Sequence, residues 1–156
     1  MKKLSAEVIN FLEKQEFVIV SSFDIAGGIH CSAKGIAGVD GGGKIFLIDI
    51  YKGKTSENLR KNPAVSITAI DAHLFMGFTL QGVARILERD QIEGHFIKRW
   101  EEKVVKRISQ RVIKHIKDER KMLHHPEAKF PQPQHLIEID VENIVDLTPH
   151  HLKPSA

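Results

Sequence analysis

The sequence has one cysteine and no long apolar run. With Cys31 alone, an internal disulfide framework is excluded. Its place in an apolar stretch favours a structural thiol over a nucleophile. No segment reaches the roughly 20 apolar residues that span a bilayer, and the charges that follow the opening MKKL do not match a secretory signal. We therefore expect a cytoplasmic protein without a membrane partner.

The sequence also has little net charge. The 156 residues carry 23 Lys or Arg against 20 Asp or Glu, so the formal net charge is only +3. This balance is too weak to indicate a nucleic-acid partner by itself. The composition, 42% hydrophobic and 28% charged, is typical of a globular protein. The length predicts one domain over residues 1–156, with one sizeable core.

The first half of the chain alternates apolar segments with turn residues. A short amphipathic helix is predicted over residues 6–14. Strands are predicted over residues 17–23, 29–39, 44–50, 64–70 and 75–87. Because these strands follow one another with short connections, they favour a small antiparallel barrel over a βαβ sheet. The predicted fold class is therefore mainly β with helices, and the barrel core covers about residues 17–87.

The pattern changes after residue 90. Asp90 with Glu93 resembles a capping box, and apolar residues then recur about every fourth position from Ile92 to Ile116. A helical insertion is thus predicted over about residues 90–124. A proline-rich connection follows, and alternating apolar residues predict a final strand over about residues 135–142 that returns to the barrel.

The segment DIYKGKTSENLRKNP places Gly53, Lys54 and Thr55 between a strand and a short helix. The first N–H groups of a helix that begins near Ser56 favour an anion. Thr55 or Ser56 can cap this helix or donate a hydroxyl to phosphate, and Lys54 adds a positive charge. A Walker A loop needs glycine at position 48, where isoleucine stands, so a nucleotide triphosphatase is disfavoured. The alternative is a well-capped helix with an exposed lysine.

The order of these features resembles the FMN-binding split-barrel family, which includes pyridoxamine 5′-phosphate oxidase. The resemblance rests on the Asp-Gly turn at position 40, on K-T-x-x-N-L-x-x-N-P after the third strand, and on an aromatic-x-x-x-G segment in the fifth. It implies a split β-barrel with antiparallel, Greek-key-like strands. It also implies FMN as cofactor, and a homodimer with its flavin sites at the subunit interface.

The resemblance further implies which residues contact FMN. Lys54 and Thr55 match the basic and hydroxyl positions that hold the flavin phosphate, while Asn58 can orient the loop or remain a solvent-facing amide. Lys34 would stabilise the negative charge of reduced flavin; without flavin it is an exposed strand residue. The full set of implied contacts is Ser32, Ala33, Lys34, Gly35, Ile48, Asp49, Lys54, Thr55 and Asn58.

The implied function is flavin-dependent redox chemistry on a small molecule, with no catalytic side chain identified. The chain departs from the pyridoxamine phosphate oxidases in three places. The family's S-R-K is Gly53-Lys54-Thr55 here, the strand glutamine falls near Gly77, and the C-terminal arginine and histidine pair has no counterpart. Recognition of a pyridoxine phosphate is therefore not expected. The alternatives are a non-catalytic flavin or haem carrier or sensor, and a deazaflavin-dependent reductase.

Two further patterns have ordinary explanations. Nine histidines do not indicate a metal site, because the pairs His124–His125 and His150–His151 are adjacent residues that point in different directions. Residues 91–123 carry ten Lys or Arg against five Asp or Glu, which a solvated helix face explains better than a nucleic-acid partner. Phe96 and Trp100 are predicted core or interface anchors, with stacking near a partner's flavin as the alternative.

Overall fold

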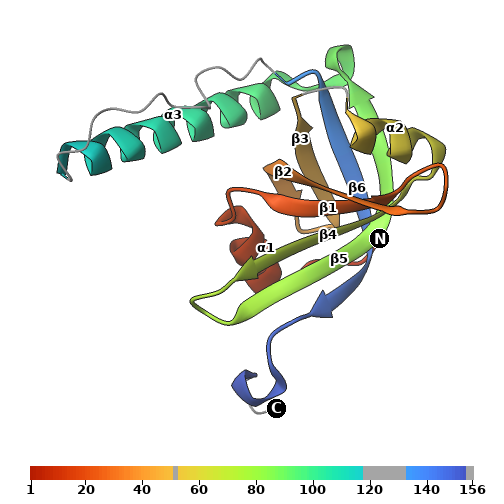
Figure 1. The fold of residues 1–156 in the computed structure, drawn as a ribbon, viewed down its shortest axis with the longest axis horizontal. Coiled ribbons are helices and arrows are strands. Elements are labelled where there is room, and N and C mark those ends of the chain that lie inside the picture. Colours follow the sequence, from red (N-terminus) through yellow and green to blue (C-terminus); the bar gives the residue numbers. More distant parts are fainter. Residues whose placement is uncertain (51–52, 118–132, 154–156) are drawn as a thin grey trace.

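Six strands form a closed antiparallel barrel in the computed structural model, which describes residues 1–50, 53–117 and 133–153 (Figure 1). Their order around the barrel is β1-β2-β3-β6-β5-β4. The strands are β1 (Val18–Phe23), β2 (Ile29–Asp40), β3 (Lys44–Asp49), β4 (Ala64–Asp71), β5 (Met76–Glu88) and β6 (His135–Asp146). The predicted fold class is confirmed. The predicted strand ends agree within one residue, except that β6 continues to Asp146.

Alternate side chains of each strand fill the barrel. Val18 and Val20 of β1 and Ile45 and Leu47 of β3 are at most 1% exposed, as expected for apolar residues at a period of two. Close backbone contact shapes β5, where the pairing with β6 shifts between Gln81 and Gly82. A Cβ atom at Gly82 would lie 2.0 Å from the carbonyl oxygen of Asp140, so this position requires glycine.

Two short helices close the two ends of the barrel. Helix α1 (Ala6–Glu13) inserts Val8, Phe11 and Leu12 into the core, and the Phe11 ring meets Phe78 edge-on with centroids 5.2 Å apart. Helix α2 (Lys54–Lys61) follows β3 at the opposite end and contributes Leu59 to the same core. Because α2 packs against β1, β2 and β5, it decides what several polar residues on those strands contact.

The long helix begins later than the sequence predicted. The capping box consists of Glu88 and Gln91 around the 3-10 turn η1 (Arg89–Gln91), and α3 runs over Gly94–Lys117. The prediction of a capping box at Asp90 and Glu93 was wrong, because β5 continues to Glu88 and the side chain of Glu88 caps the turn. Residues 118–124 of the predicted helix lie outside the described residues.

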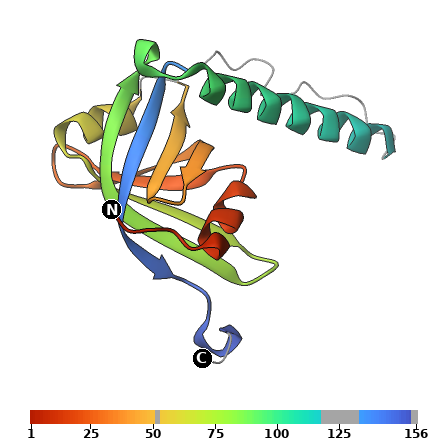
Figure 2. The ribbon, with the colours of Figure 1, turned by 180° about the vertical axis from the view of Figure 1, so that it is seen from behind.

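The first half of α3 packs on the outside of the barrel. Phe96 and Trp100 join a second apolar cluster with Ile48 of β3 and Leu136 of β6, so they are anchors within their own chain. Beyond this contact α3 extends away from the barrel (Figure 2). In the part of the chain that the structure describes, no helix is long and apolar enough to cross a membrane. After β6, a 3-10 turn, η3 (His150–Leu152), precedes the C-terminus.

Candidate functional site

The predicted phosphate-binding residues lie at the barrel end that α2 closes. Ser32 and Lys34 of β2 share the inward face with Val18 and Val20, their cross-strand partners on β1. Ala33 points the other way and is exposed. This alternation is the one expected of successive residues in a strand. Cys31 also lies on the outward side and is exposed, and its Sγ lies 3.4 Å from Ser21 Oγ.

Ser32 and Thr55 are brought together across 23 residues of sequence. Their hydroxyl oxygens lie 2.7 Å apart, and Thr55 is only 2% exposed. One turn further along α2, Asn58 is buried, and its Nδ2 donates to Ser22 Oγ at 3.2 Å. Asn58 therefore anchors α2 to β1, and the alternative of a solvent-facing amide was wrong. These two side-chain contacts hold the helix on the barrel.

Lys34 forms an ion pair with Asp49, another of the predicted contacts. Lys34 Nζ lies 2.5 Å from Asp49 Oδ1, and the side chains are 15% and 0% exposed. The second oxygen, Asp49 Oδ2, is buried without a hydrogen-bond partner. Removing a carboxylate from water is unfavourable unless a cation compensates it. Lys34 supplies that cation, so its charge is already matched within the protein.

The polar cluster extends to two residues that the sequence did not indicate. His135 of β6 pairs directly with Asp49 across β3 and β6, and with Glu88 across β5 and β6. The His135 side chain is 1% exposed, and its Nε2 lies 3.0 Å from Glu88 Oε2, so the two groups would form an ion pair when the ring is protonated. Neither ring nitrogen meets the geometry of a hydrogen bond. Glu88 also pairs with Arg60 of α2. Only the register of β6 could have revealed this cluster.

The N-terminus of α2 remains open to solvent. The N-cap is Gly53, which has no side chain to cap the helix, and Gly53 and Lys54 are exposed. The prediction that Thr55 or Ser56 would be the N-cap was wrong, since α2 begins at Lys54 and the Thr55 hydroxyl meets Ser32 instead. Lys54 Nζ is 3.9 Å from Glu57, a distant, exposed contact. Such a terminus suits an anion.

The predicted cofactor contacts suit the phosphate of FMN better than they suit its ring. At Gly53 and Lys54, the backbone N–H groups and the positive end of the α2 dipole are open to a phosphate, and the Lys54 ammonium group can add a charge-assisted hydrogen bond. By contrast, Lys34 is paired with Asp49, and the side chain of Ile48 is buried against α3. β3 is also paired on both edges at Ile48, with Gly35 and Leu136, which uses its backbone groups in the sheet. The described residues include no group of three potential metal ligands, and His150 and His151 are exposed.

A closed six-stranded barrel with a helix after its third strand and a long helix before its last defines the split-barrel class of proteins. Within that class, the chain belongs to the pyridoxamine 5′-phosphate oxidase family, whose model matches residues 4–147. This confirms the resemblance seen in the sequence. Among curated proteins, no sequence match was found.

Solved structures show the same fold at low sequence identity. HupZ from Group A Streptococcus has a TM-score of 0.62 and 17% identity, over 93% of this chain and 95% of that one. A Clostridium acetobutylicum protein of the pyridoxinephosphate oxidase family, related to general stress protein 26, has a TM-score of 0.53 and 17% identity, over 92% and 94%. An FAD-binding protein from Mesorhizobium loti has a TM-score of 0.55 and 16% identity, over 93% and 95%.

Proposed function

We propose that the protein binds FMN and uses it in redox chemistry on a small molecule. The observation that carries the proposal is the solvent-open start of α2, where Gly53 leaves the first N–H groups uncapped and Lys54 lies beside them. This terminus follows the third strand of a barrel from the pyridoxamine 5′-phosphate oxidase family. FAD binding by the Mesorhizobium loti neighbour supports a flavin as ligand.

In this proposal, some residues bind the cofactor and others hold the binding site in place. Lys54 and the α2 N-terminus bind the phosphate, while the contacts Ser32–Thr55 and Ser22–Asn58 hold α2 in position. Lys34 neutralises Asp49 beneath the helix, and in this proposal it is a structural residue. When bound, the flavin supplies hydride or electron transfer. The protein's part is to bind, orient and shield it.

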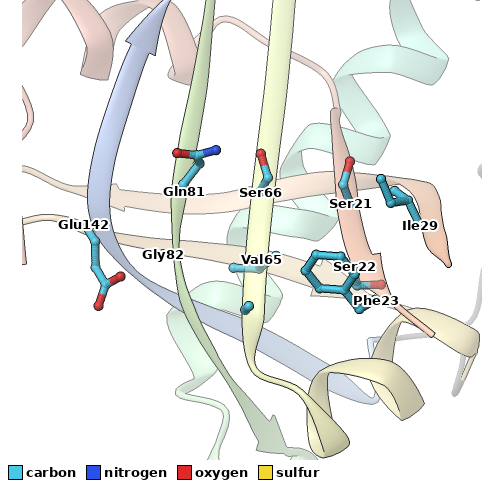
Figure 3. Close-up of a pocket in the computed structure, with 10 residues that line it drawn as sticks. Ser21, Ser22, Phe23, Ile29, Val65, Ser66, Gln81, Gly82 and Glu142 are labelled. Carbon is cyan, nitrogen blue, oxygen red and sulfur yellow. The ribbon is translucent and has the colours of Figure 1, made fainter. Parts of the chain in front are cut away.

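A homodimer would complete the proposed site. The outward positions of β1 and β4 carry no ionisable side chain, and large apolar residues among them are exposed, including Ile19, Phe23 and Ile70. A groove of about 330 Å³ lies on this face, and Figure 3 shows Ser21, Ser66 and Gln81 on neighbouring strands along it. Glu142 also lines the groove. A face in which the outward side chains of two strands carry no charge is typical of a subunit interface. We propose that a second copy covers this face and that the flavin sites lie at its edge.

The test is FMN and riboflavin titration followed by absorbance after gel filtration. Lys54→Ala should weaken FMN binding roughly ten- to hundredfold through lost charge-assisted bonds, and leave riboflavin binding unchanged. The matched control is Lys61→Ala, because Lys61 is an exposed lysine at the other end of α2 that also contacts Glu57. Thr55 is unsuitable as a test, since its buried hydroxyl meets Ser32.

The outcomes separate the parts of the proposal. Folded wild-type protein that retains no FMN would refute flavin binding. Equal losses in Lys54→Ala and Lys61→Ala would refute the phosphate assignment alone. Reduction of bound flavin by NADH or NADPH, followed by turnover with an acceptor, would distinguish an enzyme from a carrier.

A further inference from the structure

Two neighbouring residues hold all the buried side-chain nitrogen and oxygen atoms that lack a hydrogen-bond partner in the described part of the chain. These atoms are Oδ2 of Asp49 and both ring nitrogens of His135. Asp49 ends β3, His135 begins β6, and the two residues pair directly across these strands. Both are fully buried. Because buried polar groups in proteins are almost always hydrogen-bonded, this concentration at one place requires an explanation.

The two residues belong to a row of ionisable side chains at the barrel end near α2. On one side of His135, Asp49 contacts Lys34 of β2. On the other side, Glu88 of β5 contacts both His135 and Arg60 of α2. The ring therefore has a carboxylate on either side and a cation beyond each carboxylate. A positive charge on His135 would make the signs alternate along the whole row.

The contact with Glu88 places one proton on the His135 ring. Nε2 lies 3.0 Å from Glu88 Oε2. An ionised carboxylate offers only lone pairs, so Nε2 must carry a hydrogen at this distance. In a neutral ring, Nδ1 would then be a buried acceptor without a donor. Asp49, the neighbour on the other strand, also offers only acceptor atoms and cannot supply that donor.

A second proton on the ring removes this conflict, because it converts Nδ1 into a donor. Asp49 Oδ2 is the unpartnered acceptor across the strand pair, and a small rotation of the ring or one bridging water completes the link. No ion-pair contact joins the described atoms of Asp49 and His135, so Lys34 stays the nearest counter-ion of Asp49. Burial opposes a charge on the ring, whereas a carboxylate on each side favours it.

We propose that His135 binds a proton in the folded protein and then joins the start of β6 to Glu88, and through Glu88 to α2. The Glu88 side chain also accepts the backbone N–H of Gln91, so the pair lies where β5, β6, α2 and η1 meet. The other charged side chains of η1, Arg89 and Asp90, are exposed. The inference does not depend on flavin binding.

Proton binding by His135 has a definite effect on stability. An unfolded histidine loses its proton near pH 6.5. Because the folded ring holds the proton more tightly, the stabilisation is complete below about pH 6.5 and is lost as the pH rises above it. A buried histidine that stays neutral has the opposite effect, since the unfolded chain then binds the proton more readily and acid destabilises the fold.

The test is urea unfolding of the full chain at about pH 8.5 and about pH 5.5, followed by Trp100 fluorescence. A tenfold tighter hold on the proton in the folded state is worth about 1.4 kcal/mol, or about 0.7 M urea at a slope of about 2 kcal/mol per molar. The midpoint of the wild type should therefore exceed that of His135→Gln by about 0.7 M more at the lower pH. Glu88→Gln should reduce this pH-dependent difference, because it removes the carboxylate beside Nε2.

His95→Gln is the matched control. His95 Nδ1 lies 3.1 Å from Glu93 Oε2, so the contact is of the same kind, but its side chains are 55% and 73% exposed. An exposed pair contributes little. The pH dependence of His95→Gln should therefore equal that of the wild type.

Two results would overturn the inference. A loss of stability in His135→Gln that is equal at both pH values would show a purely structural ring, and a larger loss at the higher pH would show a buried neutral ring. If His135→Gln does not fold, nitrogen NMR of the wild-type ring at about pH 7.5 decides the question, since exposed histidines are mostly neutral there. Both His135 nitrogens should carry a proton, and an unprotonated nitrogen would refute the proposal.

Discussion

Replacing Lys34 with methionine tests whether this lysine compensates a buried charge. Asp49 is fully buried, its Oδ1 lies 2.5 Å from Lys34 Nζ, and its Oδ2 has no hydrogen-bond partner. Without the lysine, the carboxylate would remain buried and uncompensated. Removal of one partner from a buried pair costs about 3–5 kcal/mol. That is a large part of the roughly 5–15 kcal/mol that stabilises a typical domain.

Two further variants separate charge from packing. Asp49→Asn leaves Lys34, which is 15% exposed and can turn its long side chain toward solvent, so we expect a smaller loss of about 1–2 kcal/mol. The double variant Lys34→Met with Asp49→Leu removes both charges. Replacing a whole buried pair by apolar groups is often nearly neutral, so we expect its stability within about 1 kcal/mol of wild type.

Urea unfolding monitored by fluorescence provides the measurement. Trp100 is the only tryptophan, and it packs between α3 and the barrel, so its emission should report loss of that contact. With a slope of about 2 kcal/mol per molar urea, Lys34→Met should lower the midpoint by about 1.5–2.5 M. A shift below about 0.5 M would refute the counter-ion role. Lys34 would then return as a candidate for contact with a flavin ring.

Two other predictions concern backbone crowding and pH. Gly82→Ala should destabilise the protein by about 3 kcal/mol or more, since its Cβ would meet the Asp140 carbonyl, whereas Gly94→Ala, with open space around it, should change thermal stability by at most about 1 kcal/mol. Hydrogen bonds from Thr148, first from its backbone N–H and then from its side chain, lower the pKa of Asp146, and Lys153 lowers it further. The stability that the ionised Asp146 carboxylate contributes is therefore present above its unfolded pKa of about 3.9, and it is lost as the pH falls through the lower folded pKa. Asp146→Asn should lower the melting temperature more at pH 7 than at pH 2; equal losses at both would contradict this.

Local patterns in the sequence were sufficient for the barrel. Strand alternation and turn residues act within a few positions, so the strands were predicted closely and α2 was correctly placed after the third strand. Local reasoning failed where a tertiary contact competed with it. The Thr55 hydroxyl contacts Ser32 instead of capping α2.

By itself, then, the sequence determined the class of fold, the alternation that places Ser32 and Lys34 on one face of their strand, and the position of Gly53 and Lys54 between the third strand and a short helix. Only the tertiary structure decided what those side chains meet. Lys34 lies beside Asp49 because β2 and β3 pair with Gly35 opposite Ile48. Asp49 lies beside His135 because β6 returns in register with β3 from 86 positions further along the chain. Pairing of strands so distant depends on closure of the whole barrel, and no local pattern encodes its register.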